Sequence, residues 1–389
     1  MPDQNKHLFR SEKPYHIEPK SAEGSIITDV NGKTYIDFMS GWCVGNLGWN
    51  SPHLRDVYRE FKGPEYIYPN FIYPPWDELS ALLTSITPDN LSQCFRATGG
   101  SEAVELALQI AMAYTGRKKF LSLEDSYHGN TLGALSVGAS ENRDNLPNLL
   151  GNCRKIKFPP DKKSTGRIEM LLKKKDVAAF IMEPVLCNLG VHVPDPGFIK
   201  TLRDLCTRYG TCLIIDEVAT GFGRTGKMFA SEHFDLEPDI LCLGKAITNG
   251  HAGMGATLTS EKIARKAANK LSAYSTFGWH PFSTHAALTH LKYFIKNKTR
   301  LLDGANAASG FFRTRLSQMK FKSGGRLNII GMAISIDLEK KSYAEKVTLR
   351  CRENGLLISN QDEKIVMFPA LSIEEKIATE GLNIFERCC

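Results

Sequence analysis

Two short apolar stretches, within residues 211–218 and 239–246, dominate the hydrophobic pattern of the chain. Neither shows the alternation of apolar and polar residues that marks a half-exposed strand. Continuous apolar runs of this length are typical of strands buried on both faces of a parallel sheet. Asp216 lies near the end of the first stretch and Lys245 near the end of the second. Because charged side chains are rarely buried without partners, we expect both residues to meet a ligand at that edge of the sheet.

Strand-like and helix-like patterns alternate from about residue 75 to 280. Residues 197–209 predict a helix with one apolar face, which carries Phe198, Leu202, Leu205 and Tyr209. Further helices are predicted near 76–86 and 101–114, and strands over 120–123, 178–182 and 255–259. This alternation predicts an α/β fold with a mostly parallel central sheet covered by helices.

The two ends of the chain have a different texture. Strand-like residues 25–30 and 34–38 flank Asn31-Gly32, which is a strong hairpin signal. Beyond about 283 the pattern predicts helices near 284–297, 303–318, 342–354 and from 373, with strands over 327–336 and 355–359. We therefore expect an N-terminal segment (1–45) that packs with a smaller α+β domain (283–389), and a large cofactor-binding domain (46–282).

Composition narrows the class of protein. The net charge of +7 is mild for 389 residues, and the tightest basic run, 173–175, is typical of a solvated helix end rather than a nucleic-acid surface. The ten cysteines form no C-x-x-C motif, which favours a reducing compartment. We find neither a signal peptide nor an apolar run of about 18 residues that would span a membrane. A cytoplasmic enzyme without nucleic-acid or membrane partners is expected.

Two glycine-rich motifs suggest ligand binding, and each has a simpler alternative. Gly99-Gly100-Ser101 opens a predicted helix, where free N–H groups and the helix dipole favour an anion, although such a start is often a plain cap. Residues 221–226 match G-x-G-x-x-G, the pattern of a dinucleotide site. The segment that follows lacks a long apolar helical stripe, so a plain loop is favoured over an NAD-dependent dehydrogenase.

Pyridoxal phosphate would provide partners for both Asp216 and Lys245. The carboxylate would face the ring nitrogen and the amine would bond to the aldehyde carbon. Taken singly, each residue also fits a surface acid or a lysine that reaches solvent. Tyr127-His128 follows a predicted strand and could stack on a planar cofactor or form a structural aromatic pair. No metal is expected, because His285 and His290 are five residues apart rather than four.

Residues 215–226, with 238–240 and 244–246, resemble the signature of class III (ω-type) aminotransferases, pyridoxal-phosphate enzymes of fold type I. Residues 99–103, 126–129, 183–185 and 275–278 match in the same order. The matching blocks extend from about Asp37 to Leu371, so the resemblance covers nearly the whole chain.

The resemblance implies a role for each matching residue. Lys245 would be the catalytic residue that carries the internal aldimine, and Asp216 would pair with the ring nitrogen. Gly100 and Ser101 would hold the phosphate, Tyr127 and Val218 would enclose the ring, and His128 and Glu183 would support it. Thr276 would reach the phosphate of the neighbouring subunit, which implies a homodimer.

The resemblance also implies the reaction. An amino group would pass from an amine or amino acid to a keto acid or aldehyde in two half-reactions. An aminomutase or decarboxylase on the same scaffold is the alternative.

Three positions depart from the family pattern: Ala219, Trp279-His280 and Val366. Many members that bind α-carboxylates carry an arginine where Val366 lies. Since a buried carboxylate needs a bidentate cation, either the substrate is an amine or another arginine, such as Arg96 or Arg224, takes that role.

Overall fold

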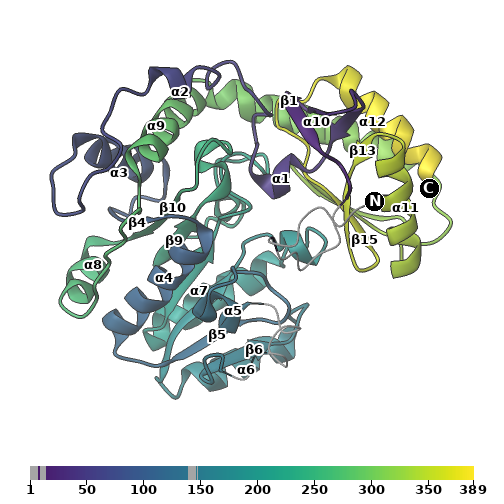
Figure 1. The fold of residues 1–389 in the computed structure, drawn as a ribbon. Coiled ribbons are helices and arrows are strands. Elements are labelled where there is room, and N and C mark those ends of the chain that lie inside the picture. The colour runs from purple at the N-terminus through teal and green to yellow at the C-terminus, as the bar shows by residue number, and fades with distance from the viewer. Residues whose placement is uncertain (1–7, 9–14, 139–145, 147) are drawn as a thin grey trace.

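A seven-stranded mixed sheet forms the centre of the protein in a computed structural model that describes residues 8, 15–138, 146 and 148–389 (Figure 1). Its strands, in spatial order, are β4 (Gln93–Ala97), β10 (Gly255–Thr259), β9 (Ile240–Leu243), β8 (Cys212–Asp216), β7 (Val177–Met182), β5 (Lys119–Leu123) and β6 (Cys153–Ile156). The strands from β9 to β6 run parallel, whereas β10 is antiparallel to both of its neighbours. The predicted α/β class with a mostly parallel sheet is confirmed.

Both faces of this sheet are covered, which explains why its strands lack alternation. In β8, Cys212 and Ile214 belong to an apolar cluster with helix α4 (Gly100–Thr115). Leu213 and Ile215 belong to a second cluster, on the opposite face, with helix α7 (Pro196–Tyr209). Each residue of the strand therefore meets an apolar layer, whichever face its side chain points to.

Local sequence signals set the ends of α7. The side chain of Asp195 accepts a hydrogen bond from the N–H of Phe198, and Pro196 occupies the first turn. Gly210 ends the helix in the left-handed conformation. These are the preferred N-cap, N1 and C-terminal residues of a helix. The predicted helix near 197–209 is therefore confirmed, with its apolar face in the core.

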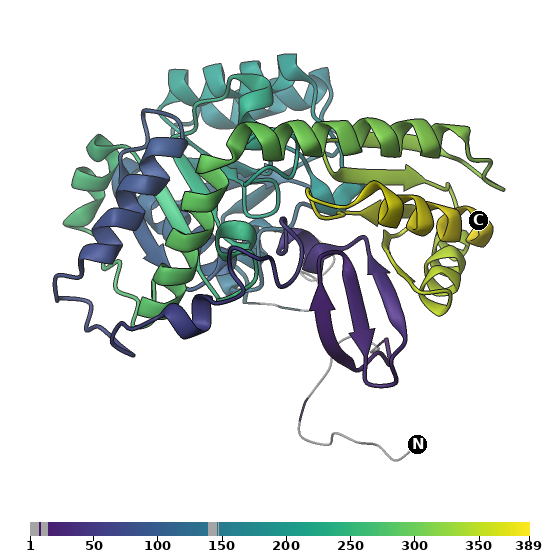
Figure 2. The same cartoon turned by 90° about the horizontal axis from the view of Figure 1, so that it is seen from above.

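Two smaller sheets lie beside the central one (Figure 2). The first contains β1 (Pro19–Glu23), β2 (Ile26–Asp29), β3 (Thr34–Asp37) and β13 (Leu356–Leu357). The hairpin predicted around Asn31-Gly32 is formed by β2 and β3. The C-terminal strand β13 then pairs in parallel with β3, so the two ends of the chain complete one sheet.

The second small sheet corrects two predictions. Residues 327–336 do not form one strand, because the chain reverses at Gly331 to give β11 (Arg326–Ile330) and β12 (Ala333–Asp337). Residues 355–359 are likewise divided between β13 and β14 (Ser359–Gln361), and the latter pairs with β15 (Lys364–Met367). In both cases the apolar run continues through the break, so its pattern gave no sign of the turn.

The remaining helices cover these sheets. The longer ones are α3 (Pro74–Ile86), α6 (Lys162–Leu172), α9 (Pro281–Lys296), α10 (Lys298–Gln318), α11 (Lys341–Glu353) and α12 (Glu375–Cys388). The shorter ones are α1 (Ser40–Cys43), α2 (Val57–Glu60), α5 (Leu132–Val137), α8 (Glu261–Ala268), η1 (Cys187–Leu189), η2 (Ala230–Phe234) and η3 (Lys245–Thr248). Within the part of the chain that the structure describes, no helix has the length and apolarity needed to cross a bilayer.

The turn at Gly331 is expected to be intolerant of any side chain. Gly331 has a φ of 55°, and a Cβ atom there would collide with the backbone of Thr225 and Gly226. Gly331→Ala should lower the free energy of unfolding by about 2 kcal/mol or more. The matched control is Gly304→Ala in α10, where a Cβ meets nothing within 4 Å and stability should rise by about 0.5–1 kcal/mol. Equal effects of the two substitutions in urea unfolding would contradict this account.

Candidate active site

Four neighbouring strands bring charged side chains into one pocket at their carboxyl ends. Lys245 follows β9, Asp216 ends β8, Glu183 follows β7 and His128 lies in the segment after β5. The pocket has a volume of about 1320 Å³. Eight of the nine predicted site residues line it: Gly100, Ser101, Tyr127, His128, Glu183, Asp216, Val218 and Lys245.

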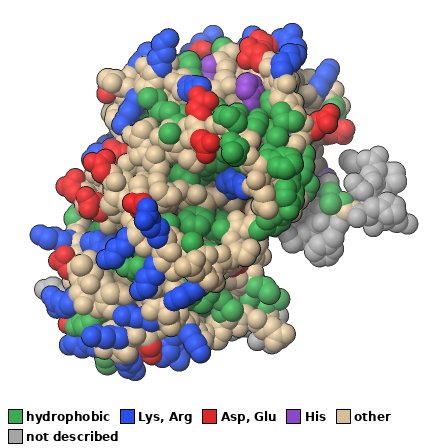
Figure 3. Space-filling view, turned by 90° about the vertical axis from the view of Figure 1, so that its left-hand side faces the viewer, with side chains coloured by type: hydrophobic (Ala, Val, Ile, Leu, Met, Phe, Trp, Pro, Cys, Tyr) green, Lys and Arg blue, Asp and Glu red, His purple; other side chains and the backbone are tan. Residues whose placement is uncertain are grey.

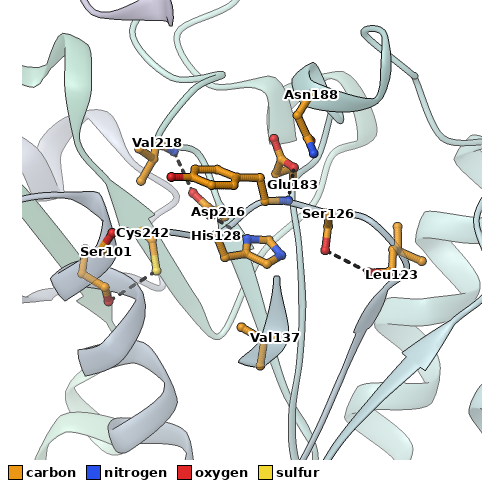
Figure 4. A network of polar contacts seen from close by, with 12 residues as sticks. Ser101, Leu123, Ser126, His128, Val137, Glu183, Asn188, Asp216, Val218 and Cys242 are labelled. Carbon is orange, nitrogen blue, oxygen red and sulfur yellow. Dashed lines mark hydrogen bonds and ion pairs between the residues drawn. The ribbon is translucent and has the colours of Figure 1, made fainter. Parts of the chain in front are cut away.

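Asp216 is held by its neighbours so that its carboxylate keeps a fixed orientation. Its Oδ2 lies 2.8 Å from Nδ1 of His128, and its Oδ1 accepts a hydrogen bond of 3.0 Å from the N–H of Val218 (Figure 4). Both Asp216 and His128 are buried. The imidazole Nε2 of His128 is also buried and has no hydrogen-bond partner within the described residues. The unused hydrogen-bonding capacity of this buried pair is therefore available to a ligand in the pocket.

Glu183 lines the same pocket as this pair. Its carboxylate accepts a hydrogen bond of 3.4 Å from the N–H of Tyr127. Burial and the nearby charge of Asp216 raise the pKa of Glu183 to about 8, against the lowering effect of Lys245. At neutral pH the carboxyl group of Glu183 is therefore mostly protonated.

Gly100 and Ser101, at the start of helix α4, form a cradle suited to an anion in the same pocket. Helix α4 begins at Gly100 and has the unsatisfied N–H groups of its first turn at the pocket. A Cβ at Gly100 would lie 2.8 Å from Cγ1 of Val218, so only glycine allows this approach. The Oγ of Ser101 accepts a hydrogen bond of 3.2 Å from the N–H of Asn130 and can donate its own proton to an anion.

Lys245 occupies a strained backbone position. It has a φ of 44°, an uncommon value for a residue with a side chain, and it begins the short helix η3 directly after Gly244. The buried residues that follow Lys245 in η3 fix this conformation against the core. Strain that the surroundings maintain in this way is characteristic of functional sites.

Thr276 is the predicted site residue that the pocket lining does not include. It lies in an exposed turn before α9, next to Phe277, whose side chain is 60% exposed. Within the single chain, the structure therefore does not bring Thr276 together with the other eight residues.

Neither candidate arginine lines the pocket in the described part of the chain. Arg224 is fully buried and donates to the carbonyl oxygens of Met332 and Pro369 and to Oδ1 of Asn46. Arg96 stacks on the ring of Trp76, with its guanidinium carbon 3.8 Å from the ring centroid. Val366 is buried in an apolar cluster with Phe368. The lysines 245 and 364 are the cationic side chains in the described lining.

One part of the pocket lining was not predicted from the sequence. Trp42 lines it, from a turn in which Ser40, Gly41, Trp42 and Cys43 all have positive φ. Cys187 and Asn188, in η1, line it as well. Consecutive left-handed residues with side chains are costly, and no sequence pattern marks them. Only the presence of Gly41 hinted at an unusual turn.

The G-x-G-x-x-G segment has a structural role. Gly223 packs near Leu371 and Phe294, where a Cβ would collide with the former. The segment leads into η2, a short 3-10 helix, instead of the long helix of a dinucleotide site. The alternative of a plain loop is therefore the one that the geometry supports.

Comparison with known proteins identifies the family. The model of the family "Aminotransferase class-III" matches residues 8–389. The adenosylmethionine-8-amino-7-oxononanoate aminotransferase of Staphylococcus aureus is 31% identical, with 98% of this chain and 93% of that protein covered. The acetylornithine aminotransferase of Archaeoglobus fulgidus is 32% identical, with 98% of each chain covered.

Solved structures agree with this result. An amine transaminase from an uncultivated Pseudomonas species, in its pyridoxal-phosphate-bound form, has a TM-score of 0.88 and 27% identity, covering 99% of this chain and 98% of its own. The adenosylmethionine-8-amino-7-oxononanoate aminotransferase of Methanocaldococcus jannaschii has a TM-score of 0.90 and 26% identity, covering 98% and 96%.

The fold and the pocket define a pyridoxal-phosphate-dependent aminotransferase of fold type I. The residues present fit the cofactor, because one pocket combines an anion cradle, a buried carboxylate and a lysine amine. The chain belongs to the class III aminotransferase family. None of the relatives described above favours an aminomutase, a decarboxylase or an NAD-dependent dehydrogenase.

The raised pKa of Glu183 predicts a pH-dependent stability of the apoprotein. The folded state keeps the Glu183 proton up to about pH 8, whereas the unfolded chain loses it near 4.5. Stability that the protonated Glu183 provides is present below pH 4.5 and is lost as the pH rises through 8. The free energy of unfolding of the wild type should therefore fall, relative to that of Glu183→Gln, across this window. Urea denaturation at several pH values measures this difference, and a constant difference would contradict the assignment.

Proposed function

We propose that Lys245 is the catalytic residue of this aminotransferase and that the eight pocket residues bind its cofactor. The observation that carries the proposal is the convergence of Lys245, Asp216, Glu183 and His128 from four adjacent strands. Such convergence at the carboxyl edge of parallel strands is the usual location of a ligand site in this type of sheet.

Each residue has a task that follows from its contacts. The bound cofactor supplies an electron-accepting ring. Asp216, held by His128 and the N–H of Val218, keeps a negative charge at the ring nitrogen. Gly100 and Ser101 bind the phosphate with N–H and hydroxyl donors. Lys245 in its neutral form moves the substrate proton at its Nζ atom. Tyr127 and Val218 limit the position of the ring.

The protein is proposed to act as a homodimer in which Thr276 reaches the phosphate site of the second subunit. Large apolar side chains are exposed on two segments, 58–72 and 274–277, and the second segment contains Thr276. Ile72 is the most exposed of these side chains, at 88%. Figure 3 faces the side of the molecule that carries α3 and shows hydrophobic side chains gathered there. The set comprises Tyr58, Tyr66, Tyr68, Phe71, Ile72, Tyr274 and Phe277. Exposed apolar patches of this kind mark protein interfaces.

The proposed substrates are an amine or amino acid as donor and a keto acid or aldehyde as acceptor. Because Lys245 reacts, Lys364 is the lysine of the described pocket lining that can bind a substrate anion, and its Nζ lies 3.7 Å from Oε1 of Glu363. A substrate carboxylate would therefore be bound at Lys364.

The division into domains and the cellular location belong to the same proposal. The division into 1–45, 46–282 and 283–389 is supported by the pairing of β3 with β13 and by the separate central sheet. A cytoplasmic location is supported by the ten cysteines, which are all free thiols.

Lys245→Ala tests the catalytic assignment. The purified wild type should absorb at about 410–430 nm through its lysine-linked cofactor. The variant should lose that absorption band, and its transamination rate should fall at least about 10³-fold. Lys364→Ala is the matched control, since it removes the other lysine of the pocket lining. The control should keep the band. Retention of the band by Lys245→Ala would exclude the assignment.

Phe277→Asp tests the proposed dimer surface. A charge at this 60% exposed ring should separate the subunits, because it cannot be buried in an apolar interface without a partner. Sedimentation velocity should show a dimer for the wild type and a monomer for the variant. Met170→Asp, at an equally exposed residue of α6, should remain dimeric. A monomeric wild type at micromolar concentration would contradict the proposal.

A further inference from the structure

One aromatic side chain in the lining of the active-site pocket has no task in the proposed chemistry. Tyr15 precedes β1, lines the pocket and is 53% exposed. The guanidinium carbon of Arg352, in the last turn of α11, lies 4.3 Å from the centroid of the Tyr15 ring. A cation at this distance over a tyrosine ring is attracted by the π electrons of the ring. This contact therefore ties the ring of Tyr15 to α11.

The backbone of the segment that carries Tyr15 is also held in place. The N–H of Val30 donates a hydrogen bond of 2.9 Å to the carbonyl oxygen of Glu18, three residues after Tyr15. On the side of α11, Nζ of Lys33 donates a hydrogen bond of 2.9 Å to the carbonyl oxygen of Glu353, which follows the arginine. The N-terminal sheet and α11 are thus joined close to the aromatic contact. Tyr15 is therefore a fixed part of the pocket wall.

The pocket has room for more than a cofactor. Its volume of about 1320 Å³ exceeds the roughly 300–1000 Å³ that is usual for a site of one small molecule. The eight proposed cofactor-binding residues line it from the region of the central sheet, whereas Tyr15 and residues 359–364 line it from the N-terminal segment and from the hairpin of β14 and β15. This second set is available to the part of a substrate that extends away from the reacting amine.

The charges of this second set leave the aromatic ring as the main recognition element for an amine. Both acidic side chains of the hairpin already have cationic partners: Nζ of Lys341 lies 2.9 Å from Oδ1 of Asp362, and Nζ of Lys364 lies 3.7 Å from Oε1 of Glu363. Arg352 adds a positive charge over the ring of Tyr15. A cationic substrate tail would be repelled by this charge, whereas a neutral aromatic tail can stack on the ring.

We propose that Tyr15 is a specificity-determining residue that selects amine donors with a neutral aromatic tail. The reacting amine lies at Lys245, and the tail packs on the part of the Tyr15 ring that Arg352 does not cover. The keto-acid acceptor of the second half-reaction uses Lys364 instead. This inference deepens the proposed transamination and rests on it.

Single-turnover measurements on the holoenzyme test the selection of the donor. The enzyme is mixed with 2-phenylethylamine, propylamine or 1,4-diaminobutane, and the loss of absorbance at about 410–430 nm gives the half-saturating concentration and the limiting rate. The half-saturating concentration of 2-phenylethylamine should be at least about tenfold lower than those of the other two amines. Tyr15→Ala should raise that concentration about tenfold for 2-phenylethylamine alone, with the limiting rate unchanged, and Tyr15→Phe should retain the wild-type value.

Tyr114→Ala is the matched control. Tyr114, in α4, also has a cation over its ring, since Nζ of Lys266 lies 4.7 Å from the ring centroid. It does not belong to the described lining of the pocket. The control therefore loses the same kind of contact away from the substrate site, and it should keep the wild-type values for all three amines.

A binding measurement separates this inference from the proposed reaction. Ligand-observed NMR titration compares 2-phenylethanol with 1-propanol, which have the shape of the amines but no amino group to react. The wild type should bind 2-phenylethanol at least about tenfold more tightly, and Tyr15→Ala should remove the difference. If the wild type converts none of the three amines, the proposed function fails, and the titration alone decides the role of Tyr15.

Three results would overturn the inference. The first is a wild type that does not prefer the aromatic ligands. The second is a Tyr15→Ala variant that keeps this preference. The third is a Tyr15→Ala variant in which all three amines are affected equally, because that result would indicate a structural role of the ring rather than contact with the substrate tail.

Discussion

The parallel pairing of β8 with β9 is the constraint on which the active site depends. This register places Asp216 opposite Cys242, three residues before Lys245, so the acid and the amine leave the sheet at the same edge. The next strands, β7 and β5, add Glu183 and His128 at that edge. The helices on both faces hold the register, since a slip by one residue would turn Asp216 into an apolar layer. The reactive geometry is therefore a consequence of core packing rather than of loop conformation.

Buried charges are handled in three different ways around this edge. Asp216 is oriented by a histidine and a backbone N–H and remains open toward the pocket. Glu217, the next residue, points away and is satisfied by Thr220 and by the N–H groups of Ala230 and Ser231. Arg224 instead has mainly carbonyl oxygens as partners. Within one segment, Asp216 therefore faces the pocket, Glu217 holds a loop and Arg224 contacts the C-terminal region.

Much of this arrangement could be predicted from the sequence, because the central strands and α7 follow local rules of burial and capping. The positions of Gly100, Asp216 and Lys245 could be predicted for the same reason, since they follow predicted strands or begin a helix. The turn at Gly331 could not be predicted, because apolar residues continue on both sides of it. The turn from Ser40 to Cys43 depends on tertiary packing that overrides backbone preference.

The closure of the first small sheet by β13 has a consequence for how the protein is made. Strands β1 to β3 leave the ribosome long before β13, the parallel partner of β3, is synthesised. The hydrogen-bonding edge of β3 and the apolar side of Ile36 therefore stay uncovered while the nascent chain grows. Such an edge invites pairing with other strands. Cells that produce the protein at high rates should therefore depend on chaperones that bind emerging chains near their N-terminus.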